Sequence, residues 1–261
     1  MIRFLTCEKH APVVHCYRKG ALFLFKRVCF TASSIILAVL LSCTSFKEEI
    51  LDDPDTTYDP NGLEEDVPAG KVFTLFSADG RPREELFYEV CVSEHAIAYV
   101  AAHAVSETTA KELLDRFENR IYPKLPLEEG QKILVLLTHM ESQIYGYSLL
   151  SEPGQTVCLN ALYPEDLLYV LAHEYQHLCA HAACEAGGTT LSEEMDELLS
   201  DLFCETLFSG WGRKRGILSE QRSENVYEKM NAWKKDSVSY AHRLLREGYT
   251  EEEMKLLMEN R

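Results

Sequence analysis

The chain has 261 residues, 46% of them hydrophobic and 26% charged, which is an ordinary globular composition with enough length for one sizeable domain or two small ones. Its formal net charge of −16 argues against nucleic acid as a partner, because phosphate binding needs basic patches. Of the nine cysteines, five lie in the body of the chain without a CxxC pair, so a dense disulfide framework is not indicated.

The N-terminal region has the pattern of an export signal. Lys26 and Arg27 precede a largely apolar run at 28–41, and Cys43 follows it. A positive flank, an apolar stretch and a small residue before a cysteine are typical of a secretory signal, and the run is short for a membrane span of about 20 residues. We therefore predict a signal peptide at 1–42, in which the first 20 residues or so are a mis-assigned start and translation begins downstream of Met1.

Residues 40–43, Leu-Leu-Ser-Cys, resemble a bacterial lipobox. The resemblance implies cleavage before Cys43 and lipid attachment to its thiol; an uncleaved N-terminal anchor is the alternative. Either way we expect an exported protein held at a bacterial membrane, on the periplasmic face or the cell surface. Residues 43–70, rich in Asp, Glu, Pro and Gly, are predicted to form a flexible acidic tether before a domain at 71–261.

The first half of this domain is predicted to mix strands with one helix. A short strand is expected at 71–76, followed by a turn at Asp79-Gly80. Helical spacing of apolar residues predicts a helix at 93–120, which Pro123 ends. Buried strands are expected at 132–137 and 156–162.

The second half is predicted to be helical. A helix at 167–183 is ended by two glycines, and a Thr190–Glu193 capping box begins the next helix, which Gly210 ends. Further helices are expected at 220–245, with Ser219 as N-cap and a break near Asp236, and at 250–260. This order predicts an α+β fold, in which a strand-and-helix half is joined to a helical half with a cleft between them.

Residues 173–177, His-Glu-Tyr-Gln-His, form an HExxH motif on a predicted helix. Side chains at i and i+4 project from one face, so His173 and His177 can reach one Zn²⁺ ion. Glu174 points into the same cleft and can take a proton from a metal-activated water. The alternative is two surface histidines on an amphipathic helix, but the apolar turn at 167–172 argues against exposure.

A catalytic zinc site needs a third protein ligand, and two candidates exist. His181 continues the i, i+4 series, but three histidines on one straight helix span about 12 Å and cannot converge on one ion. We interpret His181 as a rim or outer-shell residue. The other candidate is Glu197, twenty residues beyond His177, which shares a helix face with Asp201. A solvated acidic stripe is the alternative for these two acids.

The sequence Asp-Glu-Leu-Leu-Ser-Asp at 196–201, downstream of HExxH, resembles the gluzincin clan of zinc peptidases, of which thermolysin is a familiar member. The resemblance implies a zincin-like fold, Zn²⁺ as cofactor, Glu197 as third ligand and Asp201 as the carboxylate that orients His173. The stretch 110–208 is similar to the hyicolysin-type metallopeptidases, most specifically in the zinc motif. It departs from that family's pattern at Asp196, where Asn is typical, and at Leu198, where Gly is usual.

These features predict an exported, membrane-tethered endopeptidase, with Glu174 as general base. We expect peptide or protein substrates that pair with the strand at 156–162, and a monomeric enzyme. Tyr240 and His242 are the best candidates for the catalytic oxyanion donor, since gluzincins draw this group from the helical half, and Tyr147 is a third.

Two other functions compete with a peptidase. A binding or adhesion lipoprotein on a peptidase scaffold is one, although the intact Glu174 argues against it because a scaffold kept for binding has no use for the base. A zinc hydrolase that acts on bonds other than peptide bonds is the second, and only the family resemblance separates it from a peptidase.

Overall fold

The computed structural model describes residues 14–18, 70–127, 130–149, 155–233 and 236–261, all of which belong to one compact unit. The lipobox cysteine Cys43 and residues 43–69 of the expected tether lie outside the described residues, as does the signal peptide except for a strand, β1 (Val14–Arg18). Within the described ranges, no helix combines the length and apolar character that crossing a membrane requires.

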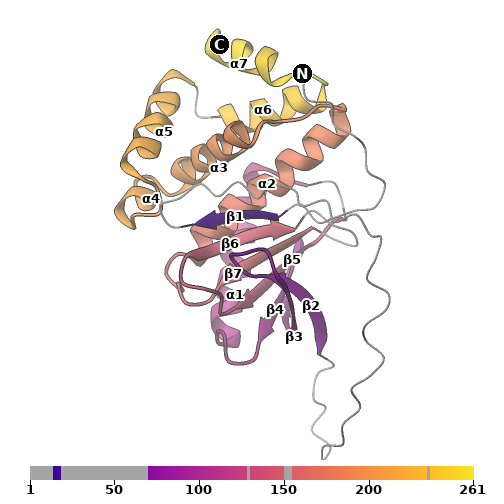
Figure 1. Cartoon of the computed structure of the whole chain (residues 1–261). Helices are drawn as coiled ribbons and strands as arrows, with labels where there is room; N and C mark the ends of the chain where they lie inside the picture. Colours follow the sequence, from indigo (N-terminus) through magenta and orange to yellow (C-terminus); the bar gives the residue numbers. More distant parts are fainter. Residues whose placement is uncertain (1–13, 19–69, 128–129, 150–154, 234–235) are drawn as a thin grey trace, which may run out of the picture. The chain divides into compact units, whose positions relative to one another are not determined.

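A seven-stranded sheet runs through this unit in the order β1-β6-β7-β5-β4-β3-β2 (Figure 1). The parallel pairs are β4–β5 and β5–β7, and the remaining neighbours are antiparallel. The strands after β1 are β2 (Lys71–Phe76), β3 (Pro82–Val92), β4 (Ala96–Ala101), β5 (Ile133–Thr138), β6 (Ile144–Leu149) and β7 (Thr156–Asn160). The predicted strands at 71–76, 132–137 and 156–162 are thus confirmed, apart from one or two residues at their ends.

The prediction of one helix at 93–120 is wrong in its first half. Residues 96–101 form β4, and only Glu107–Arg116 forms the helix α1, continued by a π-helix at Phe117–Ile121 and a 3₁₀ turn at Tyr122–Lys124. Alanine-rich β4 has helix-forming residues, but pairing with β3 and β5 on its two sides overrides that preference. Strands β3 and β6 were also not predicted.

Strand β7 does not offer the free edge expected for substrate pairing. It lies between β5 and β6, so both of its edges are hydrogen-bonded to neighbouring strands. The outer edge of β6 pairs instead with β1. The proposed binding of substrate along residues 156–162 is therefore corrected: an added strand cannot pair with a strand that already has two partners.

Helix α2 (Leu167–Gly187) positions the HExxH motif. It packs on β6 and β7, and its other sides contact α3 (Glu193–Leu207) and α6 (Ser237–Arg246). This helix is apolar on nearly every side because it is covered by the sheet and by helices, and residues from Leu167 to Ala180 are buried except Leu168. Two glycines end it as expected, with Gly188 at φ 64° as its left-handed cap.

The remaining helices are α4 (Trp211–Lys214), α5 (Glu220–Ala232) and α7 (Glu251–Glu259). The predicted helix at 220–245 is indeed broken near Asp236, into α5 and α6, and Ser219 caps α5. The predicted Thr190–Glu193 capping box is wrong. Ser192 caps α3 by accepting from the amide of Met195, and a capping box forms instead at Thr250 and Glu253 on α7. With its sheet and helices, the fold is α+β, as predicted.

Gly187 marks the closest approach of α2 to the end of α6. A Cβ at this position would lie 1.8 Å from the carbonyl oxygen of Leu245. Because that neighbour is backbone, Gly187→Ala is expected to lower the free energy of unfolding by about 1–3 kcal/mol or more. Chemical denaturation checks this, with Ala186→Ser, an exposed change one residue earlier, as the control. Equal stability of the two variants would contradict the close packing.

Candidate metal centre

Helix α2 brings its two HExxH histidines together. His173 and His177 are four residues apart and both 1% exposed, because the helix is covered by the sheet and by α3 and α6. Their Nε2 atoms lie 3.2 Å from each other, and the rings meet edge to face. Two imidazole nitrogens thus converge on one point, as the i, i+4 spacing predicts.

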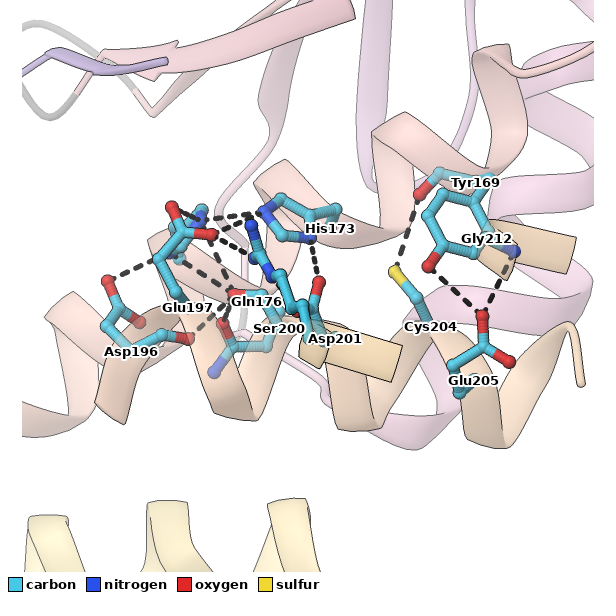
Figure 2. A network of polar contacts seen from close by, with 12 residues as sticks. Tyr169, His173, Gln176, Asp196, Glu197, Ser200, Asp201, Cys204, Glu205 and Gly212 are labelled. Carbon is cyan, nitrogen blue, oxygen red and sulfur yellow. Dashed lines mark hydrogen bonds and ion pairs between the residues drawn. The ribbon is translucent and has the colours of Figure 1, made fainter. Parts of the chain in front are cut away.

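Glu197 completes a group of three ligand atoms from the facing helix α3. Its Oε2 lies 3.5 Å from Nε2 of His173, and its Oε1 lies 3.7 Å from Nε2 of His177. The three residues, hereafter the metal group, place one ligand atom each within 4.8 Å of one another. Figure 2 shows Glu197 facing His173 across the gap between the two helices.

The spacing of the metal group fits a single ion. Ligand atoms bound tetrahedrally at about 2.0–2.1 Å are roughly 3.3 Å apart, and here the two imidazole nitrogens lie 3.2 Å apart, with one oxygen of Glu197 3.5 Å from the first and its other oxygen 3.7 Å from the second. The three donors, two imidazoles and a carboxylate, also leave a fourth position open. This buried group could therefore bind a metal ion.

A carboxylate lies behind each histidine. Nδ1 of His173 lies 3.5 Å from Oδ1 of Asp201, the residue that the gluzincin resemblance implied as its partner. Nδ1 of His177 lies 2.8 Å from Oδ2 of Asp196, a contact that the sequence interpretation missed. Burial alone lowers the pKa of His177, but Asp196 and Glu197 outweigh it and raise that pKa to about 10. Carboxylates behind the imidazoles fix the rings and strengthen them as ligands.

Arg222, on the first turn of α5, was also missed. Its guanidinium donates to Oε2 of Glu197 through Nη2 and to Oδ2 of Asp201 through Nε. The capping residue Ser219 accepts from the amide of Arg222 and so holds this turn in place. Burial raises the pKa of Glu197, but the two histidines and Arg222 hold it well below its usual range. The guanidinium fixes Glu197 and Asp201 together.

Glu174 follows the first histidine and lies in a different environment. It is 1% exposed, and the Ser148 hydroxyl lies near enough to lower its pKa, although neither carboxylate oxygen meets full hydrogen-bond geometry with a described residue. Burial raises its pKa to about 7, although His173 and His177 act in the opposite direction. A buried carboxylate with such a pKa, next to a group that can hold a metal, has the properties of a general base.

The other predicted site residues lie outside the metal group. His181 is half-buried, with Nδ1 3.6 Å from a carboxylate oxygen of Glu185, one turn further along α2. Tyr147 is buried in a cluster on the sheet face that α2 does not cover, and its hydroxyl accepts from the amide of Phe76 at 2.9 Å.

The two C-terminal candidates for the oxyanion donor are not brought to the metal group. His242 is buried with Nε2 3.1 Å from Nε2 of Gln176, and burial lowers its pKa to about 4, so the ring is neutral at pH 7. The ring of Tyr240 lies 4.8 Å from the guanidinium of Arg243 and 4.4 Å from that of Arg261. A catalytic role for either residue stays a prediction.

In comparisons with known proteins, the chain matches no protein-family model and no curated protein sequence.

Proposed function

We propose that this protein is a zincin-like, gluzincin-type zinc peptidase that hydrolyses peptide bonds. One observation carries the proposal: the metal group converges on one side of α2, and the carboxylate of Glu174, next to His173 on the same helix, is buried. Two imidazoles and one carboxylate with an open position form the donor set of catalytic zinc sites, which supports zinc over calcium or magnesium.

In this mechanism the chain supplies ligands, orientation and a proton carrier. His173, His177 and Glu197 would hold the zinc ion, which supplies Lewis-acid polarisation of the scissile carbonyl and the attacking water. Asp201 and Asp196 hold the two imidazole rings from behind. Glu174 takes a proton from the attacking water and passes it to the leaving amine.

Metal analysis combined with a cleavage assay tests the proposal. The purified protein should contain about one zinc per chain, as a single catalytic site requires. It should cleave casein, lose that activity with a chelator and regain it with added zinc. Bound zinc without cleavage of any unstructured substrate would favour a binding or adhesion lipoprotein. Zinc-dependent hydrolysis of esters or other bonds, without peptide cleavage, would favour a different zinc hydrolase.

Asp201 offers a sharper test of the site. Asp201→Asn should weaken zinc affinity about 10- to 100-fold, because carboxylates that orient a ligating histidine contribute that much. Competition with a coloured chelator measures the affinity. Glu194→Gln, a charge-matched change at an exposed position of the same helix, should leave it unchanged. If both variants bind zinc as the wild type does, Asp201 does not support the metal group.

We further propose that the peptidase is tethered to a membrane through lipid on Cys43. The support is the lipobox-like sequence at 40–43 and its apolar run. Labelled palmitate should be incorporated into the wild-type protein and not into Cys43→Ser. Label that persists in the variant would contradict the lipid anchor and leave the proposed enzyme untouched.

A further inference from the structure

A cavity of about 550 Å³ opens at the N-terminal end of α2, away from the metal group. It lies where the end of α1, the start of α2 and the end of α3 meet. Its apolar wall is formed by Leu168, Tyr169, Leu207, Phe208 and Trp211. In Figure 2, Tyr169 lies with Glu205 at the opposite end of the polar network from Glu197. The volume falls within the range of about 300–1,000 Å³ that is typical of small-ligand sites.

Two arginines line the same cavity. Arg116 and Arg120 are four residues apart on the continuous α1 and π-helix, and both are exposed. Among the described residues, neither guanidinium has a carboxylate within ion-pair distance, although the chain carries a net charge of −16. Like charges at this spacing repel each other, and an anion between them would remove the repulsion.

Arg120 is already held in a fixed position. Its guanidinium lies 4.5 Å from the centre of the Phe208 ring, and Nη2 donates to the carbonyl of Leu207 at 2.7 Å. One N–H of the Arg120 guanidinium is used in this contact, so its other N–H groups can donate to a carboxylate. Because the side chain is fixed before binding, less conformational entropy is lost when a ligand arrives.

The acids near this cavity are engaged elsewhere. Glu165 lines it, but its carboxylate pairs with Arg215 at 2.9 Å. Asp166 accepts from Arg215 and from the indole of Trp211.

From this combination we propose that the cavity binds a carboxylate attached to an aromatic or aliphatic body. The two guanidinium groups bind the carboxylate, and the apolar wall around Phe208 and Trp211 binds the body. A free aromatic acid and the C-terminal residue of a short peptide share this chemistry. The site does not depend on the metal group, because no lining residue is a proposed metal ligand.

Calorimetric titration of the full chain tests the site with two matched ligand pairs. The first is acetyl-Gly-Phe and its C-terminal amide, and the second is 3-phenylpropionate and its amide. At least one acid should bind with a dissociation constant below about 1 mM, as the usual ligand efficiency for this size predicts. Its amide should bind about tenfold or more weakly, because a charge-assisted hydrogen bond is lost. If the dipeptide acid binds more tightly, the natural ligand is a peptide C-terminus. If phenylpropionate binds as tightly or more tightly, the natural ligand is a free acid.

Arginine variants locate the binding. Arg116→Met and Arg120→Met should each weaken the acid about tenfold or more. Arg116 is exposed at a helix end, so its variant remains informative if Arg120→Met is unstable. Arg243→Met removes another arginine that lies over an aromatic ring, outside the cavity, and should bind as the wild type does. The tryptophan fluorescence of the chain should change when the ligand binds, because Trp211 lines the cavity. The chain's other tryptophan, Trp233, is buried outside the cavity.

Three results would overturn the proposal. Equal affinity for acid and amide would show that the charge is not recognised. Unchanged affinity in both Arg116→Met and Arg120→Met would place the carboxylate at another site, such as a bound metal. No binding of either acid at about 10 mM, ten times the expected constant, would show that the cavity does not take this class of ligand.

Discussion

Glu174→Gln should lower peptide hydrolysis about 10⁴-fold while zinc content and stability stay close to those of the wild type. General-base catalysis is typically worth about 10²- to 10⁴-fold, and the upper end applies because this carboxylate also returns the proton to the leaving amine. Glutamine keeps the shape of the side chain but cannot accept the proton. The variant keeps His173 and His177, and replacing a buried carboxylate by a neutral amide relieves a desolvation cost.

Hydrolysis of one unstructured peptide by matched, zinc-loaded proteins measures this effect. Glu185→Gln makes the same chemical change at an exposed position on the same helix and should cleave as fast as the wild type. Metal analysis of all three proteins separates loss of the base from loss of the ion. Equal rates for wild type and Glu174→Gln would mean that the activity belongs to a contaminant or to another site.

The parts of the site that depend on helix spacing could be predicted from the sequence. His173 and His177 converge because they are one turn apart on one helix, and Glu197 and Asp201 share a face for the same reason. Matching these two faces across the α2–α3 contact needed the family resemblance, since spacing within one helix does not say which helix it meets. The structure brings Glu197 to the two histidines and Asp201 to His173.

Contacts between elements far apart in the sequence could not be predicted in this way. Arg222 follows Asp201 by twenty-one residues, and only the packing of α5 on α3 brings its guanidinium to both acids. The contact of Asp196 with His177 depends on the rotation of α3 against α2. Helix periodicity does not encode either geometry.

The same limit applies to the fold. Continuous apolar strands such as β5 were recognised because the run is too short for most helices and contains β-branched residues. Strand β4 (Ala96–Ala101) was included in a helix because the helical spacing of apolar residues was extended over 93–120, and its partners β3 and β5 decide otherwise. Sheet order decides which strand has a free edge, and so the interior place of β7 could not be read from residues 156–160 alone.

Glu197→Ala should lose zinc under conditions in which the wild type keeps about one ion per chain. The carboxylate is the only member of the metal group that α3 contributes, and its two oxygens lie 3.5 and 3.7 Å from the two imidazole nitrogens. Loss of an outer-shell partner costs about 10- to 100-fold in affinity, so loss of a ligand itself should cost more than about 100-fold.

His181→Ala is the matched control for this last measurement, because His181 is the other third-ligand candidate on α2. Its Nδ1 lies 3.6 Å from Glu185 and His181 is not a member of the metal group, so the variant should keep the full zinc affinity of the wild type. Competition against a chelator of known affinity measures the zinc affinity of the wild type, Glu197→Ala and His181→Ala. Circular dichroism confirms that each protein is folded. Full zinc in Glu197→Ala together with loss of zinc in His181→Ala would reverse the ligand assignment. Loss in both variants would mean that the metal site extends along α2 and that the three-residue group is incomplete.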